Sequence, residues 1–149
     1  MPVATLTRFA LISAVLCLVG CDPGGRSDPP VDPTASDFLL TEVASLYEMN
    51  TLDKGKPPRR AVDLEKYSAA FPMGYIAITG GDVVAFWGVA PSQSSEAAST
   101  VLAYEKKAPD QGGAVLMLDG KTVKNLTAEE FKAAPKAGPD PTAPAKKKA

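Results

Sequence analysis

The chain has 149 residues, with 16 lysines and arginines against 17 aspartates and glutamates, and it contains no histidine. The balanced charge argues against broad electrostatic attraction to nucleic acid, and the missing histidine removes the commonest general base and metal ligand. Both cysteines, Cys17 and Cys21, lie near the N-terminus. The rest of the chain can therefore build neither a disulfide framework nor a zinc cluster.

An apolar run occupies residues 9–20. It is shorter than the roughly 20 residues that a helix needs to cross a bilayer, and it fits the apolar region of a secretory signal. The run ends in Leu18-Val19-Gly20-Cys21, which resembles the bacterial lipobox. The resemblance implies cleavage before Cys21 and transfer of a diacylglyceryl group to its thiol.

We therefore expect residues 1–20 to be a lipoprotein signal peptide and Cys21 to be a lipid anchor. Two or three acyl chains make membrane attachment stable, whereas one chain is marginal. The protein would then be attached to a cell membrane and face the periplasm or the exterior. Asp22 resembles the inner-membrane retention signal of known lipoprotein sorting systems.

Two segments rich in proline flank the body of the chain. Residues 21–36 are dominated by Pro, Gly, Asp and Ser, and residues 135–149 are rich in Pro and Ala and end in three lysines before Ala149. Neither composition can bury enough apolar surface to order itself, so we expect a disordered tether and a disordered tail. Residues 37–134 would form the folded head.

An amphipathic helix is expected to open the head. Ser36 is a suitable N-cap, and Leu39, Val43, Leu46 and Met49 share one face at helical spacing. Phe38 and Tyr47 flank that face. The segment 51–60 contains Pro57-Pro58 and is expected to be a loop, and residues 62–71 would hold one or two helical turns with Asp63 as their cap.

The second half of the chain is expected to be mostly strands. Two β-rich runs flank Gly80-Gly81-Asp82 within residues 74–89, which predicts a hairpin. Residues 101–105 predict a further strand. Asp119-Gly120 predicts a second hairpin with a two-residue turn, in which Leu116 faces Val123 and Met117 faces Thr122.

A capping box, Thr127-x-x-Glu130, predicts a short C-terminal helix that Phe131 anchors on the sheet. The predicted fold class is therefore α+β. An N-terminal amphipathic helix would pack on a small antiparallel sheet of about five strands, followed by the short helix.

Two stretches resemble known bacterial proteins. GKPPRRAVDL, residues 55–64, is similar to the run after the first helix of type IV pilin-like and type II secretion pseudopilin-like proteins. Residues 102–126 resemble the C-terminal Gly-Gly…Asp-Gly hairpin of a pseudopilin-like group of unknown function. The resemblance implies a pilin-like head, but the lipobox stands where pilins carry a long apolar helix, so fibre assembly is not implied.

Few residues suggest chemistry. The serines of the polar loop, Ser92, Ser94, Ser95 and Ser99, have no histidine to activate them. A dyad of one of them with Lys106 or Lys107 has nothing to fix its geometry, and lysines of ordinary pKa are poor bases. Glu105 and Asp119 would be the carboxylate pair of an acid–base mechanism, but solvated charges at strand ends are the favoured explanation of both.

Calcium is the one metal for which candidate ligands exist, because hard oxygen ligands suit it. Glu105, Asp110 and Asp119 would have to converge with loop carbonyls. Trp87 and Phe86 point to opposite faces of a strand, so either one would line a partner surface if its face were uncovered.

The sequence thus favours a non-catalytic envelope lipoprotein without a cofactor, attached to the membrane through Cys21. Its head would have a structural role or bind another envelope protein, and no nucleic acid. The alternative is an accessory head of a secretion or pilus-like system that binds Ca²⁺ or a small ligand.

Overall fold

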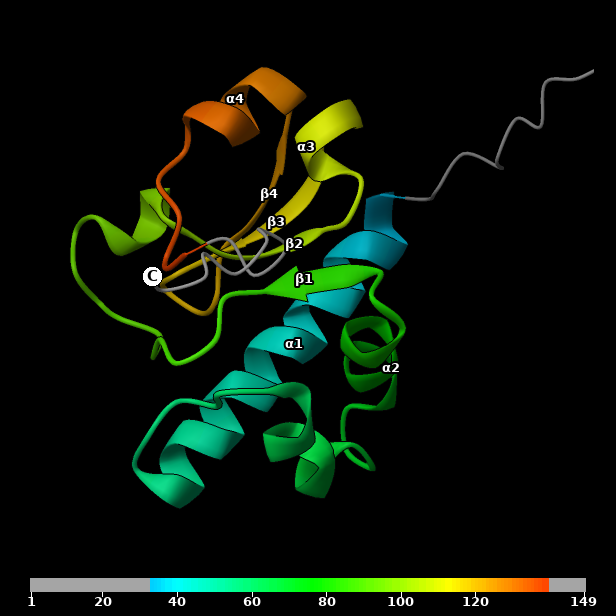
Figure 1. Cartoon of the computed structure of the whole chain (residues 1–149), viewed down its shortest axis with the longest axis vertical. Helices are drawn as coiled ribbons and strands as arrows, with labels where there is room; N and C mark the ends of the chain where they lie inside the picture. Colours follow the sequence, from blue (N-terminus) through cyan, green and yellow to red (C-terminus); the bar gives the residue numbers. More distant parts are fainter. Residues whose placement is uncertain (1–32, 140–149) are drawn as a thin grey trace, which may run out of the picture. The chain divides into compact units, whose positions relative to one another are not determined.

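The computed structural model describes residues 33–139 of the chain (Figure 1). The elements are α1 (Pro33–Lys54), the 3-10 helix η1 (Ala61–Tyr67), α2 (Pro72–Gly80), β1 (Val83–Ala85), the 3-10 helix η2 (Ala97–Ser99), β2 (Val101–Glu105), α3 (Ala108–Gln111), β3 (Gly113–Met117), β4 (Val123–Leu126) and α4 (Ala128–Ala133). The predicted signal peptide, the lipobox and most of the two predicted tails lie outside these residues.

The fold is α+β, and its sheet has four antiparallel strands in the order β1-β2-β3-β4. The sequence predicted about five strands, so the predicted number is wrong. Each strand pairs with its neighbour in sequence, which makes the sheet a simple meander. Helices α1 and α2 lie on one side of the sheet and α3 and α4 on the other (Figure 1).

Helix α2 replaces the first strand of the predicted hairpin around Gly80-Gly81-Asp82. Pro72 stands at its N1 position, and Gly81 ends it with a left-handed φ of 79°. These are the residues that begin and end helices well. The intervening sequence is rich in β-formers, but Ala77 and Ile78 bury their side chains in the core as helical residues. The propensity for a strand is overridden by packing.

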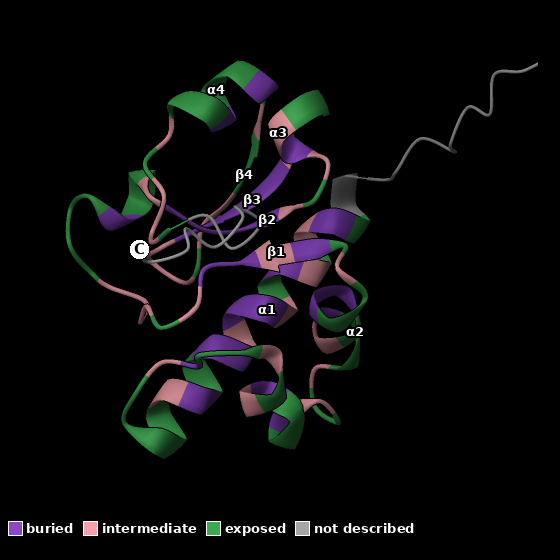
Figure 2. Cartoon of the chain, viewed as in Figure 1, coloured by how far each residue is buried: buried purple, intermediate pink, exposed green. Residues whose placement is uncertain are grey.

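Helix α1 is amphipathic, but its buried face differs from the predicted one. Leu40, Val43, Leu46 and Tyr47 are completely buried. Leu39 is only partly buried, and Met49 and Phe38 are exposed. The buried face is about one residue out of phase with the prediction and wider than it (Figure 2), because α1 packs against α2 and η1 as well as against the sheet.

The boundaries of the head are wider than predicted. Residues 33–36, placed in the tether by the sequence, form the first turn of α1. Ser36 is therefore inside the helix and is not its N-cap. At the other end, Lys136 forms a parallel bridge with Val101, so residues 135–137 continue the packed structure beyond the predicted boundary.

The β3–β4 hairpin has the predicted register, with Leu116 opposite Val123. The Met117 N–H donates to the Thr122 carbonyl at 2.8 Å, as expected for the next pair. The predicted two-residue turn is wrong. Such a turn needs a positive φ at both Asp119 and Gly120, and of these two residues only Gly120 has one, of 70°. The connection is a four-residue loop, residues 118–121, in which the Gly120 N–H donates to the Met117 carbonyl.

Two apolar clusters cover the two faces of the sheet. The larger joins α1, α2 and η1 to one face of the strands. The smaller contains Phe86, Tyr104 and Phe131 on the other face. Phe131 lies 4.7 Å from Tyr104 between ring centroids, and the capping box of Thr127 and Glu130 that positions its helix is present. Both predictions for α4 are confirmed.

Within residues 33–139, none of the helices combines the length and the apolar character that crossing a lipid bilayer demands.

Candidate functional site

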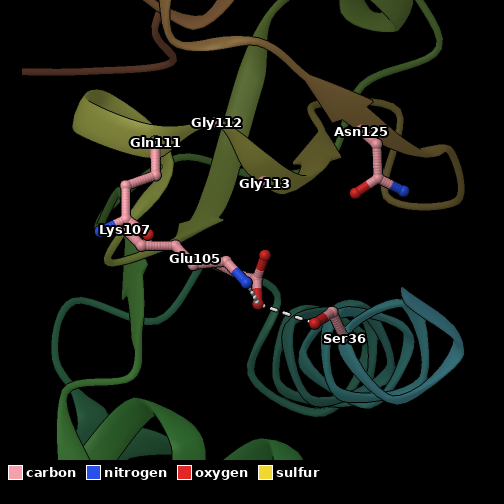
Figure 3. A pocket seen from close by; sticks show the side chains of 7 residues that line it. All are labelled: Ser36, Glu105, Lys107, Gln111, Gly112, Gly113 and Asn125. Carbon is pink, nitrogen blue, oxygen red and sulfur yellow. Dashed lines mark hydrogen bonds and ion pairs between the residues drawn. The ribbon is translucent and has the colours of Figure 1, made fainter. Parts of the chain in front are cut away.

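A group of polar side chains surrounds Glu105, at the end of β2. A pocket of about 270 Å³ opens there, lined by Ser36, Glu105, Lys107, Gln111, Gly112, Gly113 and Asn125. Figure 3 shows Ser36 reaching Glu105 from α1, with Lys107 and Gln111 on one side and Asn125 across the opening. We call Glu105 with its three partners, Ser36, Lys107 and Ala114, the Glu105 cluster.

Both oxygens of the Glu105 carboxylate accept hydrogen bonds. Oε1 accepts the hydroxyl of Ser36 at 2.7 Å, and Oε2 accepts the backbone N–H of Ala114 at 2.7 Å. The Lys107 ammonium lies 3.5 Å from Oε1, and the Glu105 side chain is 14% exposed. A nearly buried carboxylate is thus surrounded by donors, which is the arrangement that makes its burial tolerable.

Gly112 and Gly113, at the start of β3, lie where other atoms of the protein approach the backbone closely. A Cβ atom on Gly113 would lie 2.6 Å from Glu105 Oε2, and one on Gly112 would lie 2.7 Å from the Leu126 carbonyl. Gly112 also has a φ of 76°, which favours glycine. The Gly-Gly pair is therefore explained by close approach and backbone conformation, and it needs no ligand.

The Glu105 cluster is poorly suited to catalysis. The Ser36 hydroxyl donates a hydrogen bond to the Glu105 carboxylate, and a carboxylate is a weak base for activating a hydroxyl. Ser36 itself is 4% exposed, so its oxygen is shielded from a substrate. The cluster ties the beginning of α1 to the sheet, 69 residues away in sequence.

The structure does not bring the three calcium candidates together. Glu105 contacts the beginning of β3 through Ala114, whereas Asp119 follows the other end of that strand. Asp110 lies in α3 and does not line the pocket at Glu105. No group of three acidic side chains that would hold a metal ion exists within residues 33–139.

Asp119 organises the hairpin loop instead. Its Oδ1 accepts the N–H groups of Lys121 at 3.0 Å and Thr122 at 2.9 Å, and its Oδ2 accepts the Thr122 hydroxyl at 2.5 Å. Burial raises the pKa of Asp119, but these hydrogen bonds to Thr122 and Lys121 outweigh it and leave the pKa below its usual value. Asp119 thus stabilises the loop as in an Asx turn, by accepting the N–H groups of residues two and three positions further along the chain.

The predicted catalytic alternatives find no geometry either. Ser94 donates its N–H to Ser92 Oγ, and Ser99 donates its hydroxyl to the Glu96 carbonyl. Ser92, Ser94, Ser95 and Ser99 are all absent from the lining of the pocket that contains Lys107. The carboxylates of Glu105 and Asp119 lie at opposite ends of β3 and cannot act on one substrate atom.

The large aromatic residues of β1 and its extension point to opposite sheet faces, as the alternation predicted. Phe86 is buried in the smaller cluster. Trp87 is partly buried against the larger one and stacks on Tyr47 at 5.9 Å. Burial accounts for both, so neither forms an exposed aromatic patch.

A second pocket, which was not predicted from the sequence, lies between the end of α1 and η1. It measures about 530 Å³ and is lined by Asn50, Lys54, Lys56, Pro57, Arg59, Arg60 and Asp63. We call it the basic pocket. Its signal in the sequence is four cations within the seven residues 54–60, a local charge pattern that stands out in a chain of nearly neutral charge.

The sequence suggested Asp63 as the cap of the helical turns, but Asp63 lies inside η1. Residue Arg60 is the N-cap. Asp63 Oδ2 accepts the Arg59 N–H at 2.9 Å, and this backbone hydrogen bond is the main cause that lowers the pKa of Asp63. The carboxylate thus holds the loop before η1 against the helix.

Comparison of the chain with protein families, with curated proteins and with solved structures finds no match.

Proposed function

We propose that the protein is a bacterial lipoprotein, anchored through Cys21, whose residues 33–139 form a non-catalytic head at the cell envelope. The head has a structural role or binds another envelope protein. The resemblance to pilin-like and pseudopilin-like heads belongs to the same proposal and rests on residues 55–64 and 102–126.

The observation that carries the proposal is the motif Leu18-Val19-Gly20-Cys21 directly after the apolar run of residues 9–20. The thiol of Cys21 would receive the lipid, so that it is an anchor and takes no part in redox chemistry. Removal of residues 1–20 would also remove Cys17, and the mature chain would have no other cysteine.

The environment of Glu105 supports a non-catalytic head. Glu105, a nearly buried carboxylate that lines a pocket, accepts hydrogen bonds on both oxygens, from Ser36 and Ala114. A general base needs a lone pair that is directed at a substrate proton. We do not retain the calcium alternative, because Glu105 and Asp119 lie at opposite ends of β3.

Metabolic labelling with a radioactive fatty acid tests the anchor. The wild-type chain should incorporate label and partition into the detergent phase, and Cys21→Ser should lose both properties. Cys17→Ser is the matched control, because it removes a thiol four residues away and should keep the label. Label that persists in Cys21→Ser, or disappears equally in both variants, would refute the assignment.

The interaction role is tested by co-purification from detergent-solubilised membranes with a tag placed after Ala149. A partner that is retained by the wild-type chain and by Cys17→Ser supports the proposal. Robust turnover by the purified protein in a broad hydrolase screen, abolished by Glu105→Gln, would contradict the non-catalytic head.

A further inference from the structure

The basic pocket has a large excess of positive charge. Four of its lining side chains are cations, Lys54, Lys56, Arg59 and Arg60, and one is an anion, Asp63. Their sum is 4 − 1 = +3, whereas the whole chain carries −1. The excess is local and reflects the position of the cations rather than the general composition.

Little of this charge is neutralised by the protein. The Arg60 Nε lies 3.6 Å from Asp63 Oδ1, and the Lys54 ammonium donates to the Asp63 carbonyl at 3.2 Å. Nearby, Asp53 pairs with Lys66 at 2.9 Å and accepts the Tyr67 hydroxyl at 2.7 Å, and neither Asp53 nor Lys66 lines the pocket.

The two remaining cations have no such partner. Within residues 33–139, the side chains of Lys56 and Arg59 make no ion pair and no hydrogen bond to another side chain. Both are exposed. Their charges are therefore available to an anion that enters the pocket.

The backbone that carries these cations is fixed at several points. Gly55 ends α1 with a φ of 63°, and its N–H donates to the Thr51 carbonyl at 2.9 Å. The carbonyl of Pro58, a buried residue, accepts the Gly88 N–H at 2.7 Å. Asn50 Nδ2 donates to the Asp63 carbonyl at 2.9 Å and joins α1 to η1. A fixed backbone reduces the entropy that a ligand must overcome to order the site.

Asn50 gives the wall of the pocket one further polar feature. The residue is 1% exposed, and its Oδ1 has no donor among the groups that the structure describes. Buried acceptors without a donor are uncommon in proteins.

From this geometry we propose that the basic pocket binds a phosphate group. A phosphate offers up to two charges and several oxygens to a set of cations, and the guanidinium fork of Arg59 matches two of them. A single carboxylate would neutralise only part of the excess. The volume of about 530 Å³ lies within the range of small-ligand sites and leaves room for the esterified part of the molecule.

The proposal does not depend on the lipid anchor. The same phosphate chemistry occurs in a soluble phosphate ester and in the headgroup of an anionic lipid, and the test separates these two sources.

Isothermal titration calorimetry on the full chain in a non-ionic detergent provides the test. The probes are inorganic phosphate, glycerol 3-phosphate and dihexanoyl phosphatidylglycerol, with dihexanoyl phosphatidylcholine as the lipid without net charge. Saturable binding of the phosphate probes at low ionic strength is expected. Preference for glycerol 3-phosphate indicates a soluble ester, and preference for dihexanoyl phosphatidylglycerol over both soluble probes and the zwitterionic lipid indicates a headgroup.

Matched charge variants locate the site. The double variant Lys56→Gln/Arg59→Gln should weaken binding at least tenfold, because charge-assisted hydrogen bonds to both cations are lost. Lys121→Gln/Lys132→Gln removes the same charge from exposed positions outside the pocket and should bind as the wild type does. All are exposed positions, and circular dichroism checks that each variant is folded.

The conservative variant Arg59→Lys keeps the charge and removes the fork, so its affinity should fall between those of the wild type and the double variant. Absence of saturable binding to every phosphate probe would overturn the proposal. Equal weakening in the two double variants would also overturn it, because it would assign the binding to net charge and not to the pocket.

Discussion

Helix α2 approaches α1 so closely at Gly74 that a methyl group there should destabilise the protein. A Cβ on Gly74 would lie 2.7 Å from the Glu42 Cβ and 2.9 Å from the Val43 nitrogen. The Gly74 N–H, in the first turn of α2, also donates to Glu42 Oε2 at 2.7 Å. The clash is with backbone and Cβ atoms of α1, which cannot rotate away.

The magnitude follows from two opposing effects. Replacing glycine by alanine inside a helix normally stabilises it by about 0.5–1 kcal/mol. Overpacking of a close contact costs about 1–3 kcal/mol. Gly80 is the matched control, since it lies in the same helix and a Cβ there meets only Asp82 Oδ2, at 3.7 Å. The difference between the two variants therefore isolates the clash, at about 1–3 kcal/mol.

Urea unfolding followed by circular dichroism measures both variants. Gly80→Ala should be as stable as the wild type or slightly more stable, and Gly74→Ala should be less stable. Each 1 kcal/mol corresponds to about 4–8 °C in Tm for a domain of 60–100 residues. If Gly74→Ala equals or exceeds Gly80→Ala in stability, the close packing of α2 on α1 is wrong.

Three further predictions concern hydrogen bonds at helix and strand ends. Glu105→Ala should lower the free energy of unfolding by about 1–3 kcal/mol, because buried donors lose their acceptor. Glu48→Ala, on the exposed face of α1, is the control and should change it by less than about 0.5 kcal/mol in the same urea assay. Equal losses in the two variants would contradict the role of the Glu105 cluster. Thr127→Ala should cost about 1 kcal/mol by removing the N-cap. The hydrogen bond from the Thr127 N–H lowers the pKa of Glu130, so its contribution is present above the usual glutamate pKa and is lost as the pH falls through the lowered value. As the pH is lowered, the free energy of unfolding of the wild type should therefore fall more than that of Glu130→Gln. If the two proteins lose stability in parallel, the contribution of the Glu130 carboxylate is refuted.

The parts of the fold that the sequence predicted well are specified by local signals. The register of Leu116 with Val123 follows from alternation and the short connection between the strands. The capping box of Thr127 and Glu130 involves residues three positions apart. Such signals depend on neighbours in the chain, so they hold whatever the rest of the protein does.

The wrong predictions come from contacts that residue propensities do not describe, one of them long-range and the other local. The β-rich composition of residues 74–80 concealed a helix whose limits, Pro72 and Gly81, were visible in the sequence. Asp119 does not adopt the positive φ of a two-residue turn, because its carboxylate accepts the backbone N–H groups of the loop. Neither outcome follows from residue propensities alone.

The candidate sites show the same division. Glu105 was recognised as a notable carboxylate, but its partner Ser36 lies 69 residues away and nothing in the sequence joins them. The cations of the basic pocket are close together in residues 54–60, so a count of local charge would have found them. Asn50 and the concavity of the surface depend on the position of η1 against α1.

The hydrogen bond between Ser36 and Glu105 has a mechanical consequence for an anchored protein. A load applied through Cys21 would enter the head at Pro33, only three residues before Ser36. The 2.7 Å bond to Glu105 and the burial of Leu40 one turn further on would therefore resist the first displacement of the helix end. Tension would be passed to the middle strands of the sheet before α1 could unravel.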